Sequence, residues 1–355
     1  MPRHKWSPTC PPPRDLVRPV PVDPTGANGP TRGQARGRRW RQSSYGMYVP
    51  AHVDAGVPEQ RVLEQSVRLP KGGAVTGWGS CRLHQATFFD GLMPDGATPF
   101  PVPLCAGPRA QLLENGECTV SRERLPVSEV VRRFGIPCTV PLRALFDEMR
   151  SARDLREAVV AMDMMAAAEL VSISQMCAYV AERAGWVGVE QVRRALRLAD
   201  ENSRSPNETR MRLVWQLDAD LPRPLVNKDV FTVSGKFLGC ADLFDPEAGV
   251  VGEYDGADHR GALRHSRDVL REERFRRAGL EYFKITGPDM SRPQRMVDRM
   301  HSTRARAKWL PERQRAWTID PPPGWPVSRS LDDELELRRV MAEVYEEQER
   351  LASGE

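Results

Sequence analysis

The stretch from Ser205 to Asp289 constrains the fold most, because carboxylates stand there within or beside segments that have a clear strand or helix pattern. Its first part, Ser205-Pro206-Asn207-Glu208-Thr209, is typical of a helix start, with Asn207 as the expected cap and Glu208 in the first turn. The turns that follow are apolar along one side, with Met211, Leu213, Val214, Trp215 and Leu217. The sequence therefore predicts a helix that presents Glu208 at its N-terminal end.

Four strands and two further helices are predicted after this helix. The strand-like segments are Leu225 to Val233, Phe237 to Phe244, Gly249 to Tyr254 and Glu281 to Thr286. A helix from about Leu263 to Ala278 lies between the last two strands, and a basic helix spans roughly Arg292 to Leu310. The order helix, three strands, helix, strand predicts a compact α+β core.

Three acidic residues of the predicted strands suit a metal site. Asp242 stands in an apolar run, where a charge without a partner would be costly. Pairing of adjacent antiparallel strands would bring Asp242 beside Glu253, and Asp255 follows on the same strand face. A hard cation such as Mg²⁺ or Mn²⁺ prefers oxygen ligands and can activate a water. Glu208, Asp242 and Glu253 are therefore predicted to hold a metal, with Asp255 as an alternative to Glu253.

Each of these residues also has a purely structural interpretation. A carboxylate such as Glu208 is favourable in a first turn because of the helix dipole. Glu253 and Asp255 are an acidic pair at a hairpin end, Asp255-Gly256 is an ordinary turn dipeptide, and His259 is a loop histidine. Arginines alternate with acidic residues along the helix from Leu263 to Ala278, which is typical of an exposed, salt-bridged face.

The same residues resemble the PD-(D/E)XK nuclease superfamily, in particular a branch similar to very-short-patch repair endonucleases. The matching positions are Glu208, Asp242, Glu253, Asp255, Gly256, His259, Arg267, Asp268 and Arg271. The resemblance implies a restriction-endonuclease-like αβββαβ core. It also implies hydrolysis of DNA phosphodiester bonds that depends on Mg²⁺ or Mn²⁺.

One position departs from the superfamily's pattern, because Asp255 stands where a lysine is expected. Lys236 and Lys284 are candidate replacements for that lysine. The repair-type branch works without it and uses a histidine as proton carrier, so the resemblance implies that His259 is the general acid or base. Arg267 and Arg271, four residues apart on one predicted helix, would bind phosphate.

Composition narrows the class of protein without identifying a partner. The 355 residues suggest two domains with tails. The 52 basic and 48 acidic residues leave a net charge of +4, which is too mild to indicate nucleic acid by itself. The seven cysteines are scattered and lack a Cys-x-x-Cys pair, which disfavours a zinc ribbon or disulfide framework and favours a reducing cytoplasm. No apolar run reaches the length of a membrane span.

The chain is expected to have four parts. Residues 1–44 are rich in proline and arginine and are predicted to be a disordered tail, the alternatives being a DNA-binding arm or a start assigned too far upstream. Residues 45–200 are predicted to be a mixed α/β domain, and residues 201–310 the nuclease-like domain. Residues 311–355 are predicted to be a proline-rich linker and an acidic helical tail from Asp332 to Leu351.

The second part resembles type IV antitoxins of abortive-infection toxin–antitoxin systems. The matching pieces are Tyr45 to Pro50, Thr76-Gly77-Trp78, Phe88-Phe89-Asp90-Gly91, and Thr139 to Arg143 with Asp147. That family usually begins with a winged helix-turn-helix, in which Tyr45 to Pro50 would be a wing strand. Here the proline- and arginine-rich segment replaces the preceding helices. The resemblance implies DNA and a cognate toxin as partners.

Two functions from different classes remain open. The first is a Mg²⁺-dependent DNA endonuclease linked to a toxin–antitoxin or phage-defence system, with Glu208, Asp242, Glu253, Asp255 and His259 as catalytic residues. The second is a non-catalytic DNA-binding antitoxin or transcriptional regulator that retains a nuclease fold. A scaffold protein, which binds neither metal nor nucleic acid, is a third interpretation.

Overall fold

The computed structural model describes residues 7–93, 95–256, 262–326 and 330–353, with the backbone alone over 262–268 and 345–353. The chain divides into two compact units, Met1–Leu196 and Arg197–Glu355, whereas the sequence predicted the boundary between residues 200 and 201. Both units mix helices and strands, so the fold is of the α+β type. Within the described ranges no helix is both long and apolar enough to cross a membrane.

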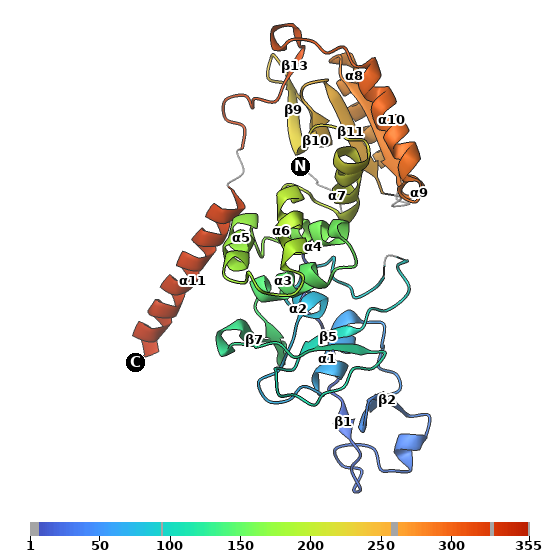
Figure 1. The fold of residues 1–355 in the computed structure, drawn as a ribbon, viewed down its shortest axis with the longest axis vertical. Helices are drawn as coiled ribbons and strands as arrows, with labels where there is room; N and C mark the ends of the chain where they lie inside the picture. The colour runs from blue at the N-terminus through green and yellow to red at the C-terminus, as the bar shows by residue number, and fades with distance from the viewer. Residues whose placement is uncertain (1–6, 94, 257–261, 327–329, 354–355) are drawn as a thin grey trace. The chain divides into compact units, whose positions relative to one another are not determined.

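The N-terminal unit begins with a small antiparallel sheet in the order β1-β3-β2 (Figure 1). Its elements are β1 (Val20–Pro21), η1 (Gln34–Arg36), β2 (Trp40–Ser44) and β3 (Met47–Pro50). The prediction of a disordered segment over residues 1–44 therefore needs correction for the described part, residues 7–44. Gln60 of α1 (Pro58–Ser66) exchanges two hydrogen bonds of 2.9 Å with the backbone of Val17, and Arg41 contacts Glu64 at 2.7 Å. These tertiary partners order the segment although its composition is poor in apolar residues.

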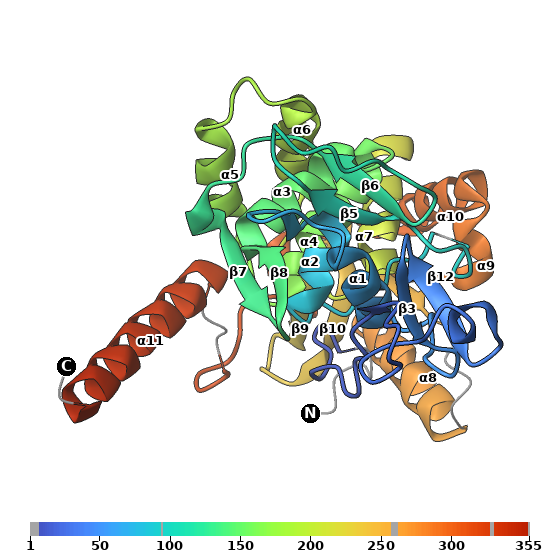
Figure 2. The same ribbon diagram turned by 90° about the horizontal axis from the view of Figure 1, so that it is seen from below.

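A second sheet has the strand order β6-β5-β4-β8-β7. Its strands are β4 (Ala74–Val75), β5 (Val102–Cys105), β6 (Cys118–Ser121), β7 (Val130–Arg133) and β8 (Ile136–Thr139). Figure 2 shows β7 and β8, an antiparallel hairpin that the sequence did not predict, lying side by side. The helices of this unit beyond α1 are α2 (Gly77–Leu83), η2 (Val127–Glu129), α3 (Pro141–Ser151), α4 (Leu155–Ala167), α5 (Ile173–Ala181) and α6 (Val189–Leu198).

Arg143 of α3 lies at the centre of a buried charge network. Its side chain is fully buried and contacts Glu129 at 2.9 Å and Asp147 at 2.8 Å. The ring of Trp186 covers its guanidinium at 4.7 Å. Arg183 also contacts Glu129 at 2.7 Å, so each buried charge has a partner of opposite sign. Arg143 and Asp147, which carry part of the resemblance to the antitoxins, therefore have a structural role in this fold.

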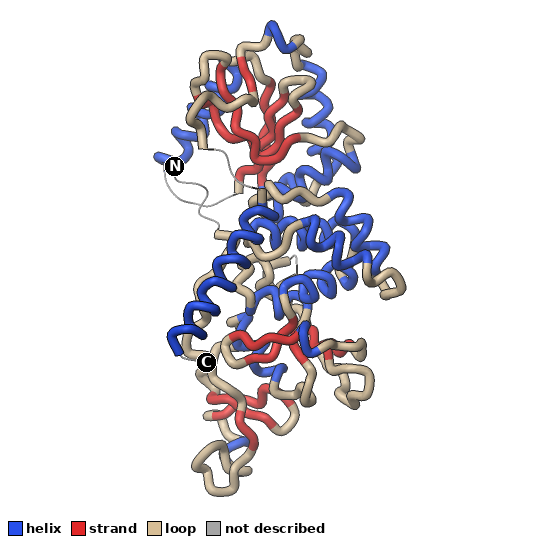
Figure 3. Tube along the Cα trace, turned by 90° about the vertical axis from the view of Figure 1, so that its left-hand side faces the viewer, coloured by secondary structure: helices blue, strands red, loops and turns tan. Residues whose placement is uncertain are grey.

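The C-terminal unit is built on a sheet in the order β12-β11-β10-β9-β13, drawn red in Figure 3. Its strands are β9 (Leu225–Thr232), β10 (Phe237–Asp245), β11 (Val250–Asp255), β12 (Glu281–Thr286) and β13 (Trp317–Thr318). Strands β9, β10 and β11 form an antiparallel meander, and β12 runs parallel to β11. The predicted strands β9 to β12 match these bounds to within a residue at nearly every end, because turn residues separate the apolar runs.

Helices of the C-terminal unit pack through two apolar clusters. The helical elements are α7 (Pro206–Leu213), η3 (Val214–Asp218), α8 (Ala262–Arg277), α9 (Gly287–Met290), α10 (Pro293–Arg306) and η4 (Glu312–Gln314). One cluster joins Trp215 to Met296 of α10, and the other joins Phe275 of α8 to Phe244. Ser205 caps α7 by accepting a hydrogen bond from the Glu208 amide, so the expected cap at Asn207 is wrong.

The segment after α10 is part of the C-terminal sheet rather than only a linker. Strand β13 pairs with β9, and the ring of Trp325 lies 4.9 Å from that of Phe231 and 5.1 Å from that of Phe237. Trp325 also donates a hydrogen bond of 3.1 Å to Asp229. The predicted acidic helix is present as α11 (Leu331–Ser353).

The network around Arg143 generates a stability prediction. Replacing Arg143 with Met removes the cation that Glu129 and Asp147 share and leaves them with Arg183 and Arg150, so the loss should exceed about 1 kcal/mol and stay below the about 3–5 kcal/mol of a fully unpaired buried charge. Amide hydrogen exchange of α3 peptides in the full chain measures this loss. The control is Arg153→Met, whose side chain is 55% exposed, so that its ion pairs contribute at most about 1 kcal/mol. Equal losses in the two variants would contradict the structural role of Arg143.

Candidate active site

Asp242 and Glu253 lie together because of the register between β10 and β11. Leu243 pairs with Gly252 in an antiparallel register. Asp242, which precedes Leu243, is therefore opposite Glu253, which follows Gly252. Both residues are buried, with 6% and 2% of their surface exposed. The Tyr254 amide donates a 2.9 Å hydrogen bond to Oδ2 of Asp242, which fixes that carboxylate against β11. The structure thus brings together two of the predicted site residues.

Glu208 reaches this position from the first turn of α7. Its Oε2 accepts hydrogen bonds from the Arg204 amide at 3.0 Å and from Nδ2 of Asn227 at 2.8 Å. Its Oε1 accepts a hydrogen bond of 3.0 Å from the hydroxyl of Ser205. Only 7% of Glu208 is exposed, so these donors replace the water that a carboxylate would otherwise bind. We refer to Glu208, Asp242 and Glu253 as the carboxylate cluster.

Arg271 and Tyr282 hold the third member of the cluster. Oε2 of Glu253 contacts a guanidinium nitrogen of Arg271 and accepts a 3.2 Å hydrogen bond from the Tyr282 hydroxyl. Burial, followed by the negative charge of Glu253, raises the pKa of Tyr282 well above its usual value, so the phenol stays protonated as a donor. Arg271 was predicted to bind phosphate, and in the structure its guanidinium is engaged by the carboxylate cluster.

The other carboxylates of the cluster act on the pKa of Asp242. The pKa of Asp242 is raised well above its ordinary 3.8, first by burial and then by the charges of Glu208 and Glu253. The Tyr254 amide and Arg271 oppose this rise and are outweighed. Either a proton or a cation therefore stabilises Asp242 in this place.

The carboxylate oxygens of the cluster suit a hard divalent cation, although their present positions do not form a metal site. Mg²⁺ and Mn²⁺ prefer carboxylate oxygens to nitrogen or sulfur ligands, and all three side chains of the cluster are carboxylates. Among the described residues, no three His, Cys, Asp or Glu side chains converge closely enough to hold a metal as they stand. A bound cation would have to draw the cluster's side chains closer together.

Asp255 lies outside the cluster. Its side chain is 47% exposed and contacts Nζ of Lys284 at 3.2 Å. Lys284 of β12 is in register with Glu253, which places this lysine on the strand next to the cluster. Lys236, the other candidate replacement, precedes β10 and is separated from Asp242 by roughly 20 Å of extended strand. Lys284 is therefore the better placed of the two lysines.

Two predicted site residues lie outside what the structure describes. His259 falls in the undescribed range 257–261, and Arg267 belongs to the part of α8 whose side chains are not described. Asn227, in contrast, was missed by sequence reasoning and contacts Glu208 directly. Its φ of 47° is unusual for a strand residue and common for asparagine, so an Asn within a strand pattern was the available signal.

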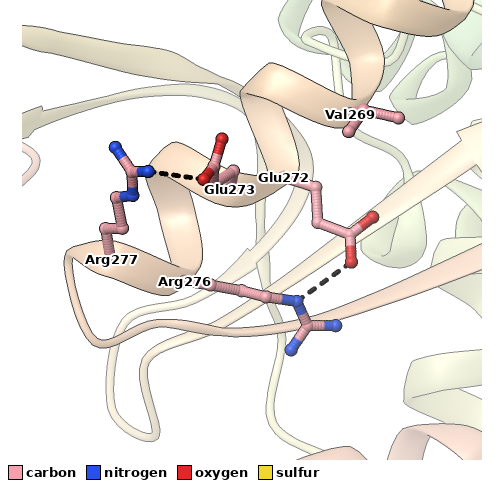
Figure 4. Close-up of a pocket in the computed structure, with 5 residues that line it drawn as sticks. All are labelled: Val269, Glu272, Glu273, Arg276 and Arg277. Carbon is pink, nitrogen blue, oxygen red and sulfur yellow. Dashed lines mark hydrogen bonds and ion pairs between the residues drawn. The ribbon is translucent and has the colours of Figure 1, made fainter.

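A shallow hollow on α8, shown in Figure 4, is not part of this site. It is lined by Val269, Glu272, Glu273, Arg276 and Arg277. Ion pairs one turn apart join Arg276 to Glu272 at 2.9 Å and Arg277 to Glu273 at 2.5 Å. This stretch of α8 is thus the exposed, salt-bridged face that the alternation of charges indicated.

The raised pKa of Asp242 predicts how stability changes with pH. A carboxyl whose folded pKa exceeds its unfolded value stabilises the fold at low pH, and this contribution is lost as pH rises above about 4 towards the folded pKa. Asp242→Asn keeps an acceptor for the Tyr254 amide and cannot ionise. In EDTA, wild type should lose more stability than Asp242→Asn as pH rises above about 4, by about 1.4 kcal/mol per pH unit until the folded pKa is reached.

Equilibrium urea unfolding at several pH values measures this difference. Asp298→Asn is the matched control, because Asp298 is an exposed residue of α10. Identical pH dependence in all three proteins would contradict the electrostatic description of the cluster.

Comparison of the chain with protein-family models, with curated proteins and with solved structures found no match. A function can therefore be proposed only from the chemistry of the carboxylate cluster and the arrangement of the fold.

Proposed function

We propose that this chain is a divalent-metal-dependent nuclease that hydrolyses phosphodiester bonds of DNA. The observation that carries the proposal is the carboxylate cluster, in which the charges of buried Glu208 and Glu253 raise the pKa of buried Asp242. Such a cluster is costly for stability unless it binds a cation, so its presence points to a site rather than to packing.

The arrangement of elements supports the proposal. The elements α7, β9, β10, β11, α8 and β12 follow the order αβββαβ, which is the order that the resemblance to restriction-endonuclease-like nucleases implies. The parallel pairing of β12 with β11, beside the antiparallel meander of β9, β10 and β11, makes one continuous sheet of these strands. The resemblance in sequence implies a metal held by the first helix and the two central strands, and Glu208, Asp242 and Glu253 belong to α7, β10 and β11.

Each residue of the cluster and its neighbours would have a defined role in binding the metal. Glu208, Asp242 and Glu253 would hold Mg²⁺ or Mn²⁺, and such a cation supplies a polarised phosphate and an activated water when bound. Ser205 and Asn227 orient Glu208, and the Tyr254 amide orients Asp242. Lys284 places a positive charge beside Glu253, from β12 instead of from β11, where Asp255 occupies the superfamily's lysine position. His259 as proton carrier stays a prediction.

A second candidate is a non-catalytic DNA-binding antitoxin or transcriptional regulator, with a cognate toxin as partner. The observation that favours it is that the cluster's side chains, as described, do not converge into a metal-holding group. Asp255 stands where the nuclease superfamily has a lysine, which also favours the non-catalytic regulator. The two candidates differ in whether metal binds and whether DNA is cut.

Cleavage of DNA tests the proposal. Wild type should cut a mixed panel of plasmid, single-stranded and mismatched DNA with Mg²⁺ or Mn²⁺. Asp242→Asn and Glu253→Gln each remove a metal ligand. Loss of a residue that only orients a ligand costs up to about 100-fold, so cleavage by these variants should fall by more than that. The control is Glu273→Gln, which removes a carboxylate from the exposed face of α8. Wild type that binds DNA and never cuts it would support the regulator instead.

Metal binding gives a test that does not depend on knowing the substrate. Mg²⁺ at about 100 times its Kd should stabilise wild type by about 2.7 kcal/mol, because the cation binds only the folded chain. A thermal shift measures this effect, and Asp242→Asn should abolish it. A shift of equal size in the variant would place the bound cation elsewhere.

A further inference from the structure

A nucleic-acid strand brings its own negative charge to the carboxylate cluster. Binding therefore needs basic side chains close to the cluster that remain available for phosphate. Arg271 and Lys284 are near the cluster, and each already contacts a carboxylate, that of Glu253 and that of Asp255 respectively. Neither supplies a positive charge that is free of a competing anion.

Arg204 contacts two of the three elements that carry the cluster, α7 and β10. It immediately precedes Ser205, the cap of α7, and its amide donates a 3.0 Å hydrogen bond to Oε2 of Glu208. Its guanidinium lies 3.8 Å from Sγ of Cys240, two residues before Asp242 on β10. The side chain thus contacts β10 two residues before Asp242, and the residue itself is exposed.

The contacts of the Arg204 guanidinium leave its charge available. Within the described residues no ion pair joins Arg204 to a carboxylate, and its side chain contacts the Cys240 thiol instead. A thiol is a weak hydrogen-bond acceptor, so it competes with phosphate far less than a carboxylate would. A guanidinium in this state presents several N–H donors in the planar arrangement that matches phosphate oxygens.

We propose that Arg204 binds a phosphate of the nucleic-acid strand adjacent to the bond at which the carboxylate cluster acts. The proposal rests on the proposed function and deepens it, because it assigns the phosphate contact to the residue before α7. Arg271, which was predicted to make that contact, instead holds Glu253 in place.

The test is equilibrium binding of labelled DNA to the full chain in EDTA, over a series of salt concentrations. Arg204→Ala removes one phosphate contact, so the slope of log K against log salt should fall by about 0.9 for duplex or about 0.7 for a single strand. The affinity loss should be the same for different sequences, because phosphate contacts carry no sequence information. Arg204→Lys keeps the charge and should restore most of the slope.

The control variant is Arg277→Ala. Arg277 is also exposed, with 76% of its side chain accessible, and is paired with Glu273 on the outer face of α8. It should leave the slope unchanged. The Arg204 substitutions should not disturb Glu208, because the hydrogen bond to that residue comes from the Arg204 backbone.

The outcomes separate this proposal from the proposed function. An unchanged affinity and slope in Arg204→Ala, or wild type that does not bind DNA at all, would overturn the role of Arg204. If wild type cuts DNA while Arg204→Ala binds and cuts equally well, only the role of Arg204 falls. If wild type binds without cutting and Arg204→Ala lowers the slope, the phosphate contact stands and the nuclease assignment falls.

Discussion

The pairing of β10 with β11 is the constraint on which the candidate site depends. Because Leu243 pairs with Gly252, Asp242 and Glu253 must lie side by side, and a shift of one residue would turn one carboxylate to the other face of the sheet. The apolar neighbours in β10 and β11 hold that register, since Leu243 and Phe244 belong to the two clusters that the helices cover. The apolar core therefore keeps two like charges together, although they repel each other.

The sequence predicted strands β9 to β12 of this sheet well, because local patterns mark their ends, and it did not predict β13. Short turns such as Ser234-Gly235-Lys236 separate apolar runs, so strand ends are visible without any tertiary information. Asp242 was also recognisable, because a lone carboxylate in an apolar run has a high cost unless it has a use. Glu208 and Glu253 followed from the predicted order of elements, which the structure contains.

Features that depend on distant partners were not predictable. The fold of residues 7–44 depends on Gln60 and Glu64, and the partner of Arg271 is Glu253, eighteen positions earlier in the sequence. Asn207 and Ser205 are both good caps by residue type, and only the structure shows that Ser205 accepts the Glu208 amide. The proline-rich segment before α11 predicts a linker, because nothing in its local sequence indicates that Trp325 contacts the sheet.

Diffraction from crystals grown with Mn²⁺ would test the central claim most directly, since the anomalous signal of this metal locates it without a model of the site. The account predicts one strong peak within about 2.0–2.3 Å of carboxylate oxygens of the cluster, with Glu208, Asp242 and Glu253 drawn together around it. A cluster that stays as described here, with manganese absent or bound elsewhere, would contradict the claim that these carboxylates form a metal site.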